Sequence, residues 1–139
     1  MERGYELIEH TADVGVVGRG PTLAAAFAAA AEGMYAVMVD LADVREREQR
    51  PVQVNGEDLG QLLTHWLVDL IFLTQSEGLL FSRFEVAMDG ERALRATAYG
   101  ERLDPARHAL GAEVKAVTRH RLSVMPVEGG YETRVIFDI

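Results

Sequence analysis

The amino-acid sequence predicts an α+β fold, a two-layer sandwich in which a mostly antiparallel sheet packs against two main helices. Two segments have the apolar spacing of helices, the rest of the chain divides into short strand-like runs, and Gly- and Asp-containing turns separate neighbouring runs. Two helices cannot cover both faces of so many strands, so one helical layer on one sheet is expected. The 139 residues fit a single domain spanning residues 1–139.

The first helix is predicted from about Thr22 to Met38. Thr22 follows a Gly-Pro pair and has the side chain of an N-cap, and alanine, the residue with the highest helix propensity, fills most of the segment from Ala24 to Ala31. Apolar residues recur there at helical spacing, namely Leu23, Phe27, Ala30, Met34 and Val37. We interpret this Ala-rich helix as a packing element.

The second helix is predicted to follow a turn at Asn55-Gly56. Asp58, with Gln61 three residues later, resembles a capping box, and the helix is expected to end near Gly78. One face of this helix carries an apolar stripe, which comprises Leu59, Leu62, Leu63, Trp66, Leu67, Leu70 and Ile71.

The remaining chain is predicted to form strands. Their expected ranges are Tyr5 to Ile8, Val14 to Gly18, Val52 to Val54, Leu80 to Met88, Leu94 to Tyr99, Glu113 to Thr118, Leu122 to Pro126 and Tyr131 to Phe137. The turns at residues 88–91 and 127–130 contain glycine and acidic residues, and they predict antiparallel hairpins.

Composition narrows the kinds of function. The sequence has no cysteine, which excludes disulfides, thiolate zinc sites and cysteine nucleophiles, so a bound metal must be held by oxygen or histidine nitrogen. The net charge of −8 argues against strong direct binding of nucleic acid and suits contact with a basic protein. The sequence has no apolar run of membrane-spanning length and no signal-peptide pattern at its start, so we expect a cytoplasmic protein without membrane contact.

The first candidate site is the polar turn at residues 9–15, with the sequence EHTADVG, between two short apolar strands. It places a carboxylate, an imidazole and a hydroxyl within a few residues, and it contains His10 and Asp13. The alternative is an Asx or Ser/Thr turn whose side chains bind local backbone amides. The turn matches neither a zincin helix nor an EF-hand loop.

The second candidate site is the end of the last predicted strand. Asp138 places a side-chain carboxylate next to the α-carboxylate of Ile139, and hard cations such as Ca²⁺ or Mg²⁺ prefer oxygen clusters of this kind. The alternative is a frayed end with a solvated acid. If this strand end lies beside the Asp13 turn, three or four oxygens converge.

The third candidate region has two parts. The polar loop after Gly100 offers Glu101, Asp104 and His108 as ligands or hydrogen-bonding residues. Lys115 is a lone lysine in an otherwise apolar strand, where a charge on an edge strand discourages association between sheets. The functional alternative is that its ammonium group neutralises a carboxylate cluster or meets a phosphate.

These motifs together resemble the archease family. The resemblance is carried by the segment from Tyr5 to Gly15, the helix with Trp66-Leu67, Phe81 to Phe84, Gly100-Glu101 with His108, Val114 to Thr118, and Phe137 to Ile139. The motifs follow one another over nearly the whole chain. An HTADVG turn near the start, VKAVT in the last third and a terminal FDI form a specific set.

The resemblance implies an accessory protein that is not itself an enzyme. Archeases are cofactor proteins of RtcB-type RNA ligases, which use GTP and Mn²⁺ to join RNA ends bearing a 2′,3′-cyclic phosphate or 3′-phosphate to a 5′-hydroxyl. These ligases act in tRNA splicing and RNA repair. The family is expected to promote guanylylation of the ligase histidine and thereby multiple turnover.

The resemblance also implies site residues. The expected metal ligands are Asp13, Asp138 and Ile139, with Ca²⁺ as the cation, and the residues expected to serve ligase activation are Asp13, Lys115 and Asp138. The secondary candidates are His10, Glu101 and His108. Two other classes of protein stay open: a stand-alone hydrolase with a metal bound by Asp13, Asp138 and His10 or His108, and a general chaperone or scaffold with an exposed apolar surface.

Overall fold

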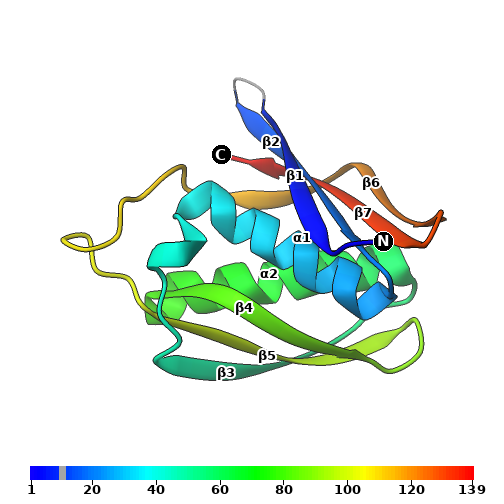
Figure 1. The fold of residues 1–139 in the computed structure, drawn as a ribbon, viewed down its shortest axis with the longest axis horizontal. Helices are drawn as coiled ribbons and strands as arrows, with labels where there is room; N and C mark the ends of the chain where they lie inside the picture. Colours follow the sequence, from blue (N-terminus) through cyan, green and yellow to red (C-terminus); the bar gives the residue numbers. More distant parts are fainter. Residues whose placement is uncertain (10–11) are drawn as a thin grey trace.

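The computed structural model describes residues 1–9 and 12–139 (Figure 1). Along the chain, the elements are β1 (Gly4–Glu9), β2 (Asp13–Gly20), α1 (Leu23–Met38), the 3₁₀ helix η1 (Leu41–Asp43), β3 (Glu48–Asn55), α2 (Leu59–Glu77), β4 (Leu79–Met88), β5 (Ala93–Arg102), β6 (Ala116–Val127) and β7 (Gly130–Asp138). Among the described residues, no helix is both long and apolar enough to cross a membrane.

The strands form two antiparallel sheets. One sheet has the order β1-β2-β7-β6 and the other has the order β3-β5-β4. Both helices contact both sheets, and Figure 1 shows the helix pair between them. The predicted α+β class and antiparallel pairing are confirmed, with one refinement: the strands divide into two sheets that share one helical layer. Helix α1 can contact both sheets because small and apolar residues occupy most of its circumference, and these residues are buried.

The Ala-rich helix α1 lies very close to strand β2. Thr22 caps its first turn, since the Thr22 hydroxyl accepts a hydrogen bond from the Ala25 N–H at 3.1 Å. A Cβ atom at Gly18 of β2 would lie 2.6 Å from the backbone nitrogen of Ala30, a distance that real Cβ atoms do not tolerate. Glycine on the strand and alanine on the helix therefore allow this approach, in agreement with the interpretation of α1 as a packing element.

Helix α2 follows its sequence prediction closely. Asp58 is the N-cap and accepts a hydrogen bond from the Gln61 N–H at 2.8 Å, while the Gln61 side chain accepts one from the Glu57 N–H at 2.8 Å. Gly78 ends the helix in the left-handed region, at φ 67°. Most of the predicted apolar stripe is buried against the two sheets, namely Leu62, Leu63, Trp66, Leu67, Leu70 and Ile71.

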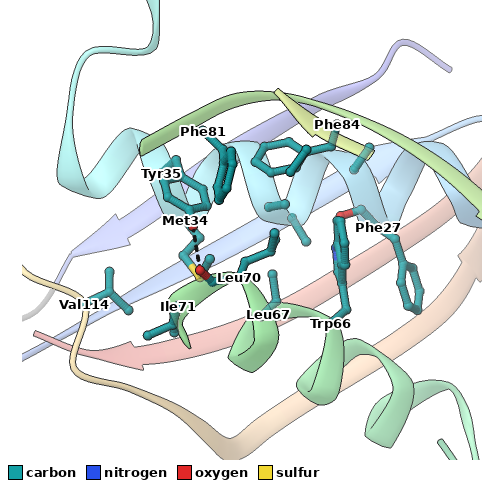
Figure 2. Close-up of a cluster of buried hydrophobic side chains, with 14 of the residues drawn as sticks. Phe27, Met34, Tyr35, Trp66, Leu67, Leu70, Ile71, Phe81, Phe84 and Val114 are labelled. Atoms are coloured by element: carbon teal, nitrogen blue, oxygen red, sulfur yellow. Dashed lines mark hydrogen bonds between the residues drawn. The ribbon is translucent and has the colours of Figure 1, made fainter. Parts of the chain in front are cut away.

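Aromatic side chains from α1, α2 and β4 meet in the core (Figure 2). The ring centroids of Tyr35 and Trp66 lie 5.7 and 5.9 Å from that of Phe84. Both polar groups of these aromatics are satisfied: Trp66 Nε1–H donates to the Phe27 carbonyl and the Tyr35 hydroxyl donates to the Leu70 carbonyl, each at 3.0 Å. The core is therefore fixed by directional contacts as well as by apolar burial.

The largest differences from the predicted strand ranges are at β3 and β6. The predicted strand at Val52 to Val54 is part of the longer β3, and the two strands predicted over residues 113–126 are one strand, β6, interrupted by a bulge between Thr118 and Ser123. Residues 113–115 precede β6. The residues at these strand ends are mostly polar and have no clear strand pattern. Whether they join a strand depends on the neighbouring strands, which the local sequence does not reveal.

Candidate functional site

Two aspartates face each other where β2 begins and β7 ends. Asp13 and Asp138 are direct cross-strand partners in the antiparallel register. Directly opposed side chains lie on the same face of a sheet with Cβ atoms about 5 Å apart. Their neighbours Val14 and Phe137 are buried in the core and hold both strand ends in place. The last strand therefore docks beside the Asp13 turn, and the two acids that the sequence singled out are brought together.

The main chain joins three segments at this acid pair. The Lys115 N–H donates to the Asp138 carbonyl at 2.8 Å, and the Ile139 N–H donates to the Ala12 carbonyl at 3.3 Å. Lys115 is exposed and lies directly before β6, which is an edge strand of its sheet. Lys115, Asp138 and Ile139 thus gather at one end of the sheet with Asp13.

One oxygen of this site is buried without a partner. Oδ1 of Asp13 has no hydrogen-bond partner among the described residues, and Thr118 Oγ1 on β6 shares this property. A buried carboxylate oxygen without a partner is costly. A hard divalent cation would satisfy it, and two carboxylates beside main-chain oxygens suit such a cation. Within residues 1–9 and 12–139 no three His, Asp or Glu side chains form a metal-binding group, so the two acids would need main-chain or water ligands as well.

The secondary candidates do not extend this site. His10 lies outside the described residues. Glu101 and His108 belong to a buried cluster at the end of β5, in the other sheet. Glu101 Oε2 accepts hydrogen bonds from the Arg45 N–H at 2.8 Å and from His108 Nε2 at 3.0 Å, and it also contacts the Arg107 guanidinium.

The Glu101 cluster has the character of a structural anchor. Burial alone would raise the pKa of Glu101, but its hydrogen bonds from Arg45, Arg107 and His108 outweigh that cost and lower the pKa to about 2. The Asp104 N–H donates to His108 Nδ1 at 2.9 Å, so Nε2 carries the proton that is donated to Glu101. The cluster ties the loop after β5 to the segment before β3.

An apolar groove adjoins Lys115, and the sequence analysis did not predict it. The groove has a volume of about 330 Å³ and is lined by Val68, Ile71, Phe72, Gln75, Lys115, Ala116 and Val117. Phe72 is 65% exposed and Val68 is 44% exposed. The sequence contained one signal for this groove. Val68 and Phe72 are four positions apart, so they lie next to each other on α2, outside its predicted apolar stripe.

Fold and site define a class of protein: a small α+β protein in which an antiparallel sheet ends in an open pair of carboxylates, with a lysine and an exposed aromatic groove beside them. The chain belongs to the archease family, because the model described as "Archease protein family (MTH1598/TM1083)" matches residues 5–139. The resemblance inferred from the sequence motifs is therefore confirmed.

Individual relatives are similar over almost their whole length. The protein archease of Pyrococcus furiosus is 38% identical over 141 residues, with 99% of each chain covered, and that of Thermococcus gammatolerans is 45% identical over 132 residues, with 92% of each covered. The solution structure of Methanobacterium thermoautotrophicum protein 1598 superposes with a TM-score of 0.85 at 37% identity, covering 98% of this chain and 99% of that one.

Proposed function

We propose that this protein is an accessory factor, not itself an enzyme, that activates an RtcB-type RNA ligase. It promotes the GTP-dependent guanylylation of the ligase and so its multiple turnover in tRNA splicing or RNA repair. Membership of the archease family supports this role. The observation that carries it is the cross-strand pair of Asp13 and Asp138, in which a buried carboxylate oxygen has no partner among the described residues.

The acid pair is proposed to hold a divalent cation, Ca²⁺. Asp13 and Asp138 would supply carboxylate oxygens and Ile139 a main-chain oxygen. The cation, when bound, supplies positive charge that neutralises the acids and can attract phosphate oxygens. The chain's own residues order this end of the sheet, because the Lys115 and Ile139 N–H groups tie the neighbouring segments together.

The surroundings of the acid pair suit contact with a protein. Lys115 is exposed beside the pair and would orient the acids or meet a phosphate in the complex. Phe72 and Val68 offer exposed apolar area next to Lys115, and exposed aromatic side chains are frequent anchors of protein interfaces. The net charge of −8 would steer the protein toward a basic surface on the ligase.

The test is multiple-turnover RNA ligation by the cognate ligase with GTP and Mn²⁺, with and without this protein. Asp13→Asn and Asp138→Asn preserve side-chain size and remove charge, so they should keep the fold and lower stimulation by about 100-fold. Asp89→Asn, in the exposed turn between β4 and β5, is the matched control and should stimulate like the wild type. Failure of the wild-type protein to stimulate the ligase would exclude this function.

The same variants separate the alternatives. A stand-alone hydrolase would turn over without any ligase, yet His108, one of the histidines considered for its metal, is fully buried against Glu101. A general chaperone would suppress aggregation of unrelated proteins and would be indifferent to Asp13→Asn. Activity in either assay, with no ligase stimulation, would replace the ligase proposal.

A further inference from the structure

Among the described residues, two hollows are each lined by more than one arginine, and they differ in how those arginines are paired. The larger is lined by Arg45, Arg47, Glu48, Glu101, Arg102, Leu103, Asp104 and Arg107, and three of its arginines lie within ion-pair distance of its glutamates. The smaller has a volume of about 130 Å³ and is lined by Ile8, Gly15, Val16, Val17, Arg121, Arg134, Val135 and Ile136. No carboxylate side chain lines the smaller hollow among the described residues.

The smaller hollow lies on the same face of the sheet as the acid pair. Gly15 and Ile136 are cross-strand partners, and each is two residues along its strand from Asp13 and Asp138 respectively. Residues two apart on a strand point to the same face. The opposite face carries the core residues of these strands, such as Val16. The acids and the hollow therefore occupy neighbouring rows of one outward face.

A bulge in β6 brings Arg121 to this hollow. Thr118 pairs with Ile136 and Ser123 pairs with Arg134, so the four residues 119–122 lie opposite Val135 alone. Arg121 has a φ of 55°, in the left-handed region that is unfavourable for a residue with a Cβ atom. Bulges re-aim side chains, and backbone strain of this kind is concentrated at functional sites.

The second arginine is held in position by a buried glutamate. Arg134 Nε donates to Glu132 Oε1 at 3.0 Å, and the other oxygen of Glu132 accepts from Arg19 Nε at 3.0 Å. This arrangement uses only Nε of Arg134 and leaves its terminal amino groups as donors. Within the described part of the chain, Arg121 has neither a hydrogen bond nor an ion pair through its side chain.

We propose that Arg121 and Arg134 form a binding site for a phosphate group. A guanidinium donates paired hydrogen bonds to phosphate oxygens, and two guanidinium groups without a lining carboxylate favour an anion. Pockets for drug-sized ligands are about 300 Å³ or larger, so this hollow admits a single small group. The group belongs either to a nucleoside triphosphate or to the end of an RNA strand. One phosphate site is compatible with weak overall affinity for RNA.

The proposal is tested on the full isolated chain by NMR titration in low salt, with inorganic tripolyphosphate as the first probe. Backbone amides of residues 119–122 should shift and saturate. Arg121→Ala should weaken binding about tenfold, because it removes a charged hydrogen-bond donor. Arg119→Ala is the matched control, since Arg119 is exposed in the same bulge without lining the hollow, and it should bind like the wild type.

Two further arms distinguish the sources of the phosphate. Binding of GTP as tightly as tripolyphosphate, with weaker binding of a short RNA ending in a 3′-phosphate, would assign the site to a triphosphate. The reverse order would assign it to an RNA end. Shifts that do not saturate, or that are the same in Arg121→Ala and the wild type, would overturn the phosphate site. None of these arms contains the ligase, so their failure leaves the proposed function standing.

Discussion

The acid pair of Asp13 and Asp138 and the cluster around Glu101 both place carboxylates at strand ends, and they differ in how the carboxylates are satisfied. Glu101 is buried and receives hydrogen bonds from a backbone N–H, an arginine and a histidine. Asp13 has a buried oxygen with no partner in the described part of the chain, and Asp138 is exposed. A carboxylate with all its partners inside the protein stabilises the fold, whereas one that lacks them is available to a ligand.

The largest effect on stability is expected from a substitution in the Glu101 cluster, where the carboxylate has all its hydrogen-bond partners within the protein. Glu101→Gln keeps the side-chain size but removes the charge that Arg107 and the buried His108 depend on. It should lower the free energy of unfolding by about 3 kcal/mol, or the melting temperature by about 10 °C, while ligase stimulation at a permissive temperature stays intact. Thermal unfolding followed by circular dichroism measures the loss. Glu91→Gln in the exposed β4–β5 turn is the control, and an equal loss in both would refute the anchor role.

Acid should weaken the same cluster over a defined range of pH. The pKa of Glu101 is lowered from 4.5 to about 2, so the unfolded chain takes up this proton more readily than the folded protein. The stabilisation is therefore complete above about pH 4.5 and is lost as the pH falls toward 2, for a total of about 3 kcal/mol. Urea unfolding at several pH values should show this slope in the wild type. The Glu101→Gln variant should have a flatter profile, and identical profiles would contradict the assignment.

Calcium should act only at the open acid pair. If Asp13 and Asp138 hold the cation, Ca²⁺ at 100 times its Kd should stabilise the fold by about 3 kcal/mol, because it binds the folded chain and not the unfolded one. A chelator should reverse the shift in melting temperature. The Asp13→Asn variant should show no shift and Glu101→Gln should show a normal one. If Ca²⁺ still stabilises the Asp13→Asn variant, the cation binds at a site other than the acid pair.

The smallest effect is expected at the bulge beside the acid pair. Glycine adopts positive φ without the Cβ penalty, so Arg121→Gly should stabilise the fold by about 0.5 kcal/mol after the entropy cost of glycine is subtracted. Arg119→Gly, at a position without positive φ, should destabilise it by a similar amount. If the two variants change the free energy of denaturant unfolding in opposite directions, Arg121 carries backbone strain close to the acid pair. Equal signs would remove that distinction.

Much of the fold was predictable because its signals are local. The N-caps Thr22 and Asp58, the C-terminal Gly78 and the apolar stripe of α2 each depend on residues a few positions apart. The division into two sheets was not predictable, since it depends on which distant strands pair. The bulge in β6 escaped prediction for the same reason, because it is defined only by the register with β7.

The candidate site was predictable in its residues but not in its arrangement. Residue type and motif resemblance singled out Asp13, Lys115 and Asp138 as site residues and Glu101 and His108 as secondary candidates. The structure shows that the two groups are far apart in the fold, since His108 in the loop after β5 binds Glu101 of that strand, whereas the two aspartates face each other in the other sheet. The groove beside Phe72 was also missed, because exposure is not visible in a helical pattern.

The sequence by itself determined the helices, the turns, the α+β class and the family, because periodicity, capping and short motifs are encoded by neighbouring residues. The tertiary structure alone decided that Asp13 meets Asp138, since they are 125 positions apart in the sequence and only the pairing of β2 with β7 brings them together. It also decided that the Glu101 carboxylate has hydrogen-bond partners while one oxygen of Asp13 has none among the described residues. Burial and hydrogen-bond partners come from segments that are distant in the chain.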